Sequence, residues 1–269
     1  MIPNGRSVLG IDAAWTTTQP SGVALVVEGG GGWRLAAVRP SYGQFIADAG
    51  QAPPNVRPTG CVPNVPALLA ACEMIYPAKP VIVAVDMPLS MMPITARRAS
   101  DQRVSVAYGK RDCSTHSPNS TRPGVISDNL RADFADAGYE LATSALIPKP
   151  ALIEVYPHPA LVELARAERR LPYKIAKVRK YWVGSTPLER KQQVIAEWAK
   201  IVALLDERIS GVSEALPPPH LDAPITVLKA YEDQIDAVVC AWVATCALEG
   251  SAVPFGDADS AIWIPAPLA

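Results

Sequence analysis

The chain has 269 residues, of which 49% are hydrophobic, and its formal net charge is −1. This length suits one large core, built as a single elaborated domain or as a domain with a sizeable insertion, and the apolar content excludes a disordered tail. No apolar run approaches the roughly 18 residues that span a bilayer, so we expect a soluble protein with no membrane partner. The near-neutral charge makes no case for nucleic acid over the chain as a whole.

The N-terminal sequence leads directly into a strand pattern, without the charged start, apolar stretch and small-residue cleavage site of an export signal. We therefore expect a cytoplasmic location. The cysteines are odd in number and widely spaced, with no CxxC pair: Cys61, Cys72, Cys113, Cys240 and Cys246. We interpret them as thiols in a reducing compartment.

The first half of the chain begins with strand signals. Three strands joined by short loops are predicted at 7–12, 21–28 and 33–39, with a tight reversal at 29–32. Short links between sequential strands imply antiparallel pairing. A helix follows at 64–76, which Asn64 can cap, and the continuous β-branched run at 81–86 is typical of a buried parallel strand.

In the second half, strand signals stop between 87 and 150. A helix-like stretch at 94–108 gives way there to a loop rich in Ser, Thr, Pro and Gly, so we interpret 87–150 as an insertion or lid. The later elements are predicted as a strand at 152–157, helices at 158–171, 187–208 and 226–249, and a short edge strand at 260–265.

Carboxylates stand at the ends of apolar strands. Asp12 and Asp86 each close such a run, and Glu154 lies within a third one. An acid at a strand's carboxyl end faces the crevice where open α/β sheets hold ligands, and a buried charge is tolerated only when paired or metal-bound. Each acid also has a structural interpretation: Asp12 as a turn cap, Asp86 as a backbone acceptor, and Glu154 as the partner of an arginine.

The last predicted helix adds two more acids. Asp233 and Asp236 are three residues apart, so they share one helical face, and an almost wholly apolar segment follows them. Asp236 therefore stands where exposed helix becomes buried helix, although an acid in a helix's first turn is also favoured by the helix dipole. We expect all five acids to converge on one site for Mg²⁺ or Mn²⁺, with Asp12, Asp86 and Asp236 as the metal ligands.

Cationic and imidazole groups supply candidate substrate contacts. Residues 166–191 hold nine basic side chains against two acidic ones, which is typical either of a phosphate-binding face or of a solvated helical surface. The individual candidates are Arg97, Arg98, His116, His158 and Lys174. His158 can equally cap the helix predicted to start there, His116 can belong to a plain polar loop, and the arginines can simply be solvated.

Seven segments along the chain resemble one family, that of domain of unknown function 429. They are GIDAAW at 10–15, VAVDMPLS at 83–90, RRASDQRVSVAYG at 97–109, CSTHSP at 113–118, IEVYPHP at 153–159, YK at 173–174 and DQIDAVVCAW at 233–242. The resemblance implies a predicted nuclease with one ribonuclease H-like domain over 1–269. It also implies a mixed five-stranded sheet with an antiparallel start followed by parallel strands, flanked by helices.

The same resemblance suggests roles for the acids. Asp12 is similar to the first-strand aspartate of the ribonuclease H-like superfamily, and Asp86 to its fourth-strand acid. Asp233 and Asp236 look like the paired helix acids of bacterial Holliday-junction resolvases, whereas Glu154 has no clean counterpart there.

Metal-dependent phosphodiester hydrolysis is therefore the expected function, with nucleic acid or a small phosphoester as the partner. A nucleotide-dependent phosphotransferase or ATPase is the second enzyme hypothesis, although Ala13-Ala14-Trp15 supplies no glycine-rich phosphate loop. A non-catalytic module that binds nucleic acid or protein is the third. A serine hydrolase is disfavoured because no GxSxG-like context occurs.

Overall fold

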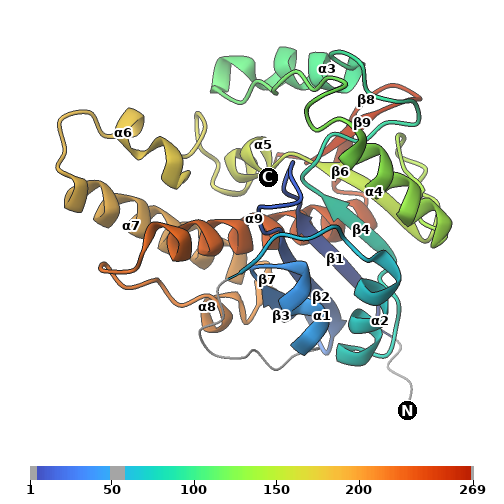
Figure 1. Ribbon diagram of the computed structural model, residues 1–269, viewed down its shortest axis with the longest axis horizontal. Helices are drawn as coiled ribbons and strands as arrows, with labels where there is room; N and C mark the ends of the chain where they lie inside the picture. The colour runs from blue at the N-terminus through green and yellow to red at the C-terminus, as the bar shows by residue number, and fades with distance from the viewer. Residues whose placement is uncertain (1–4, 49–57, 268–269) are drawn as a thin grey trace.

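A computed structural model describes residues 5–48 and 58–267, which form a mixed α/β fold with helices on both faces of one sheet (Figure 1). The described residues give this sheet nine strands, in the order β7-β3-β2-β1-β4-β6-β9-β8, with β5 also paired to β6. Their bounds are β1 Ser7–Asp12, β2 Gly22–Gly29, β3 Gly32–Arg39, β4 Ile82–Val85, β5 Glu140–Leu141, β6 Ala151–Val155, β7 Ile209–Ser210, β8 Ala252–Gly256 and β9 Ala261–Pro265.

The antiparallel start of the sheet is confirmed. β1 pairs with β2 and β2 with β3, both antiparallel, and Gly29 pairs with Gly32 across the predicted reversal. Gly31 and Gly32 have φ of 144° and 157°, which glycine adopts without steric cost. The parallel part follows on the other side of β1, where β4, β6 and β9 pair in turn.

Two predictions about the sheet are wrong. The strand at the C-terminal end is internal, because β9 pairs with β6 on one side and with β8 on the other. The sheet also has more than five strands, since β5, β7, β8 and β9 extend it. The two-residue strands β5 and β7 are too short for side-chain alternation to reveal them. Strand β8 contains Pro254, and a proline within a run argues against predicting a strand there.

Helices cover both faces of the sheet. Their bounds are α1 Tyr42–Asp48, α2 Val65–Ile75, α3 Ala99–Tyr108, α4 Val125–Asp136, α5 Pro157–Leu164, α6 Val178–Tyr181, α7 Pro187–Asp206, α8 Val212–Ala215 and α9 Ile225–Leu248, with 3₁₀ turns at Gly109–Arg111 and Ile175–Lys177. Helices α5, α7 and α9 pack into the core on one face, and α1, α2 and α4 into the core on the other (Figure 1). Helix α3 packs against β8 and β9.

Local signals fixed several helix ends. Asn64 accepts a hydrogen bond from the Ala67 amide at 3.0 Å, as its predicted capping role requires, and Thr186 with Glu189 forms a capping box at the start of α7. Helix α5 is shorter than predicted, because it ends at Leu164 and the chain takes a left-handed turn at Arg166, with φ of 48°.

Residues 87–150 contain more structure than predicted. Helix α3 begins five residues later than the predicted start at 94, where the Asp101 carboxylate accepts a hydrogen bond from the Arg98 backbone amide at 3.0 Å. Helix α4 was not predicted, because only Leu130 and Phe134 among its large apolar side chains are fully buried. All five cysteines are free thiols, and no helix among the described residues combines the length and apolarity needed to cross a membrane.

Candidate functional site

Asp12 and Asp86 lie side by side at one edge of the sheet. The parallel register pairs Ile11 with Val85, and the Asp86 amide donates to the Ile11 carbonyl at 2.8 Å. One further step along this register brings the two aspartates together on the same face of the sheet. Both are half-buried and line a cavity of about 540 Å³, which we call the carboxylate cavity.

Helix α9 lies almost in contact with the backbone of β1 and β2. A Cβ atom on Gly10 would lie 2.1 Å from the Ala237 carbonyl oxygen, and one on Gly22 would lie 2.2 Å from that of Asp233. Only glycine permits this approach. It brings the first half of α9 beside the end of β1, and Asp233 joins Asp12 and Asp86 in the carboxylate cavity.

Asp236 lies beneath the cavity and does not line it. It is fully buried, and its two oxygens accept hydrogen bonds from the Tyr173 hydroxyl, at 2.8 Å, and from Lys174 Nζ. The Lys174 side chain therefore reaches the centre of the acid cluster, where it lines the cavity. Asp236 thus fixes the positions of the Tyr173 and Lys174 side chains.

Glu232 is a member of the cluster that was not predicted as a site residue. It accepts from the Ile175 amide at 2.6 Å and from Lys229 at 3.0 Å, and it lies 3.4 Å from Lys174 Nζ. Lys229 also pairs with Asp233. The spacing of Lys229, Glu232 and Asp233 at i, i+3 and i+4 on one helix was the available sequence signal.

The acids raise one another's pKa. Burial raises the pKa of Asp12 to about 7, and the adjacent Asp233 carboxylate adds to this shift. Burial, followed by repulsion from Asp12 and Asp236, raises the pKa of Asp86 well above its ordinary value. Burial also raises the pKa of Asp236 to about 6, against the opposing effect of Lys174. Such a cluster favours any cation that enters it.

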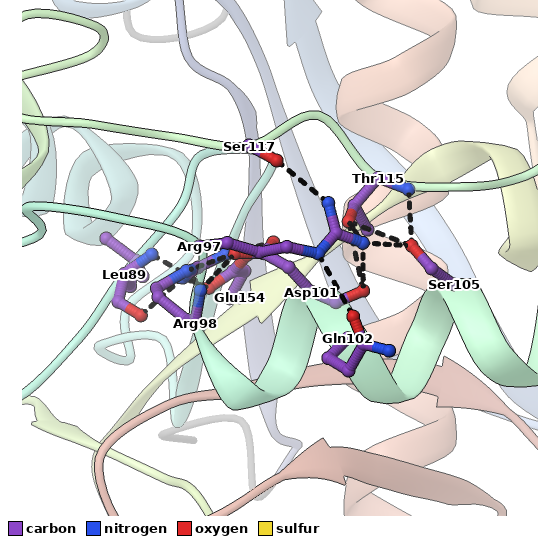
Figure 2. Close-up of polar contacts among 9 residues, drawn as sticks. All are labelled: Leu89, Arg97, Arg98, Asp101, Gln102, Ser105, Thr115, Ser117 and Glu154. Atoms are coloured by element: carbon purple, nitrogen blue, oxygen red, sulfur yellow. Dashed lines mark hydrogen bonds and ion pairs between the residues drawn. The ribbon is translucent and has the colours of Figure 1, made fainter.

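Glu154 does not join this cluster. The register pairs it with Val85, so its side chain leaves the opposite face of the sheet from Asp86. There it accepts two hydrogen bonds from the Arg98 guanidinium, at 2.5 and 2.7 Å, and one from the Leu89 amide at 2.8 Å (Figure 2). Arg98 also bonds Asp101 at 2.9 Å. Glu154 is therefore the partner of an arginine, the alternative left open by its sequence.

Arg97 has a different task from Arg98. Its guanidinium bonds Ser105 of α3 at 2.5 Å and Ser117 at 2.9 Å, and it also reaches Thr115 (Figure 2). These contacts tie the loop 113–118 to α3. Because His116 and Ser117 line the carboxylate cavity, Arg97 acts as a support for the cavity wall.

A second cavity of about 310 Å³ adjoins the first. The two share Trp15, Asp86, His116, Lys174 and Lys229 as wall residues. His158 lines the second cavity, where it is buried and stacks edge-to-face on Tyr156 and Tyr173.

The basic segment 166–191 divides between the site and the surface. Arg170, Lys174 and Lys177 line the second cavity, whereas Arg169 is exposed and Lys191 bonds the Ala223 carbonyl. Outside this segment, Arg122 lines the carboxylate cavity and lies over the Trp15 ring at 5.5 Å. Cations therefore surround the acids.

The site suits a hard cation, although it does not form a complete protein cage. Among the described residues, no group of three or more His, Cys, Asp or Glu side chains is arranged to hold a metal ion by itself. Magnesium, however, is usually held by one or two carboxylates together with water and substrate phosphate oxygens. Asp12 and Asp86 fit that pattern, because they are adjacent, oxygen-bearing and open to the cavity.

Comparison with known proteins gives one finding. The family model described as "Protein of unknown function (DUF429)" matches residues 10–260. No curated protein and no solved structure matches the chain.

Proposed function

The chain belongs to the DUF429 family, and from the chemistry of its cleft we propose that it is a metal-dependent phosphodiesterase, a nuclease of ribonuclease H-like fold. The fold assignment draws support from the strand order β3-β2-β1-β4-β6, antiparallel in its first three strands and parallel in the rest. It also draws support from a late helix, α9, that carries acids to the end of β1.

One observation carries the proposal: acidic and basic side chains line the same cavity. The acids are Asp12, Asp86 and Asp233, and the basic residues include Arg122 and Lys174. Carboxylates bind a hard cation, whereas surrounding lysines and arginines bind a phosphate. Phosphoester substrates require both kinds of group.

Asp12 and Asp86 would hold Mg²⁺ or Mn²⁺, with Asp233 completing the acidic wall. A bound divalent ion would supply Lewis-acid stabilisation of the phosphate oxygens and an activated water. Asp233 is preferred to Asp236 here, because Tyr173 and Lys174 occupy the oxygens of Asp236.

The chain's own groups have further roles in this proposal. Lys174 is held by Asp236 and Glu232 and lines the cavity, where it would neutralise charge on the substrate. His116 lines both cavities and has a lowered pKa, because of burial and then of Lys177 and Arg170. It is therefore uncharged at neutral pH and able to accept a proton.

The test begins with metal binding. Calorimetry with Mn²⁺ should show binding to the wild type, a large loss in Asp12→Asn and Asp86→Asn, and no loss in Asp222→Asn, an exposed carboxylate outside both cavities. A panel of single-stranded, duplex and branched nucleic acids should then show metal-dependent cleavage. Equal Mn²⁺ binding by all four proteins, or cleavage that survives Asp12→Asn, would contradict the proposal.

A further inference from the structure

The second cavity has a surplus of positive charge. Three of its acids already have basic partners: Arg98 bonds both Asp101 and Glu154, and Glu232 lies between Lys174 and Lys229. The remaining acid in its wall, Asp86, faces the carboxylate cavity as well, where we have assigned it to the cation.

Two basic side chains of the second cavity form no ion pair with a carboxylate in the described part of the chain. Within residues 5–48 and 58–267, neither Arg170 nor Lys177 forms a salt bridge. Burial, followed by repulsion from Arg170 and Lys174, lowers the pKa of Lys177. Positive side chains crowded together at the wall of a cavity favour an anion between them.

Buried polar atoms in the same place lack partners. In the described part of the chain, the Nδ1 atom of His158 and the Nε atom of Arg170 are both buried and make no hydrogen bond. Burial lowers the pKa of His158 well below its ordinary value, and Lys174 and Arg170 lower it further, so the ring is neutral. Buried polar groups are rarely left unpaired, so these two atoms mark an incompletely satisfied region beside the wall of the cavity.

We propose that the second cavity is a phosphate subsite, which holds a terminal phosphate of the substrate while the neighbouring phosphoester lies over Asp12 and Asp86. The inference rests on the proposed function for the identity of the reacting group. The shared wall of Asp86, His116 and Lys174 lets one substrate occupy both cavities.

The size of this cavity defines the substrate class. At about 310 Å³ it is at the small end of ligand pockets, so it admits a phosphorylated group and excludes a duplex. The substrate is therefore a phosphorylated chain end or a small molecule with two phosphate groups, and cleavage takes place next to that end.

The first experiment measures binding without catalysis. Inorganic phosphate is titrated calorimetrically into the full chain in EDTA. We expect Arg170→Gln and Lys177→Gln each to weaken binding about tenfold. Arg169→Gln, which removes the same charge from a side chain that is 72% exposed, should leave binding unchanged. Thermal unfolding of each variant checks its folding, and the half-buried Lys177 provides the second variant if Arg170→Gln unfolds.

The second experiment measures end preference. Linear oligonucleotides that differ only in a terminal phosphate or hydroxyl, together with a circular one, are digested with Mn²⁺ present. The wild type should prefer the phosphorylated end by about tenfold in kcat/KM and should leave the circular oligonucleotide intact. The Lys177→Gln variant should show no preference between the two ends.

The outcomes separate the two proposals. Phosphate binding that depends on Arg170 and Lys177, without Mn²⁺ binding or cleavage, supports the phosphate subsite and contradicts the proposed nuclease activity. Metal-dependent cleavage with no phosphate binding and no end preference overturns the subsite and leaves the nuclease. Equal loss of phosphate binding in Arg169→Gln overturns the subsite as well.

Discussion

Two groups of acids lie at neighbouring strand ends and differ in how they are balanced. Asp12 and Asp86 leave one face of the sheet, open into a cavity and repel each other. Glu154 leaves the other face, where Arg98 binds it with two hydrogen bonds. A single step of strand register separates the two environments. Burial raises the pKa of Glu154 to about 7 as well, so the pKa does not separate the two groups. The paired group serves stability, whereas the open group lines the carboxylate cavity.

Removing the arginine from the paired group should have the largest effect. Arg98→Met leaves Glu154 and Asp101 buried without their cation, and it should destabilise the protein by about 3–5 kcal/mol in urea unfolding. As a control, Lys79→Met breaks an exposed pair with Glu73 at 3.7 Å and should cost less than about 1 kcal/mol. Similar losses of unfolding free energy in the two variants would show that the buried ion pair stabilises the protein no more than the exposed one does.

The open group depends on the position of α9. Gly10→Ala places a methyl group within 2.1 Å of the Ala237 carbonyl oxygen, so α9 must shift. We expect a loss of about 1–3 kcal/mol in urea unfolding together with weaker Mn²⁺ binding. Gly43→Ala is the matched control, because nothing lies within 4 Å of its added Cβ. Unchanged stability and Mn²⁺ affinity in Gly10→Ala would refute the close-packing argument.

The open group should also make stability depend on pH. The folded-state pKa of Asp12, about 7, lies above its ordinary 3.8, so between these values the folded protein keeps a proton that the unfolded chain has lost. The stability of the metal-free protein therefore falls as pH rises through this window, by at most about 1.4 kcal/mol per pH unit from this group. Urea unfolding at several pH values measures the slope, which should be smaller in Asp12→Asn. An identical slope in that variant would remove Asp12 as its origin.

The smallest effect on stability is expected at Arg97, the neighbour of Arg98 in the sequence. Arg97→Gln removes hydrogen bonds from an exposed side chain, so global stability should change by less than about 1 kcal/mol. Because Arg97 ties loop 113–118 to α3, amide hydrogen exchange in that loop should accelerate while exchange in β1 does not. Unchanged exchange in the loop would mean that its other contacts suffice to hold it.

Sequence patterns with a short range predicted their elements well. Alternation and glycines predicted the antiparallel strands at the start of the chain, and Asn64 and Pro187 marked the beginnings of α2 and α7. Asp12 and Asp86 were found because each ends an apolar strand, a feature visible within a few residues. Asp233 was found because it lies three residues before Asp236 on one helical face, and Asp236 stands where the polar and apolar parts of that helix meet.

Only the tertiary structure decided which acids share a cavity. The partners of Glu154 and Asp236 are 56 and 62 residues away in the sequence, at Arg98 and Lys174. No local pattern indicates contacts of that range. The sequence by itself determined where the acids stand on their strands and helix. The pairing of strands and the close packing of α9 on Gly10 and Gly22 decided which acids pair with basic side chains and which line the carboxylate cavity, because charge balance depends on distance in space.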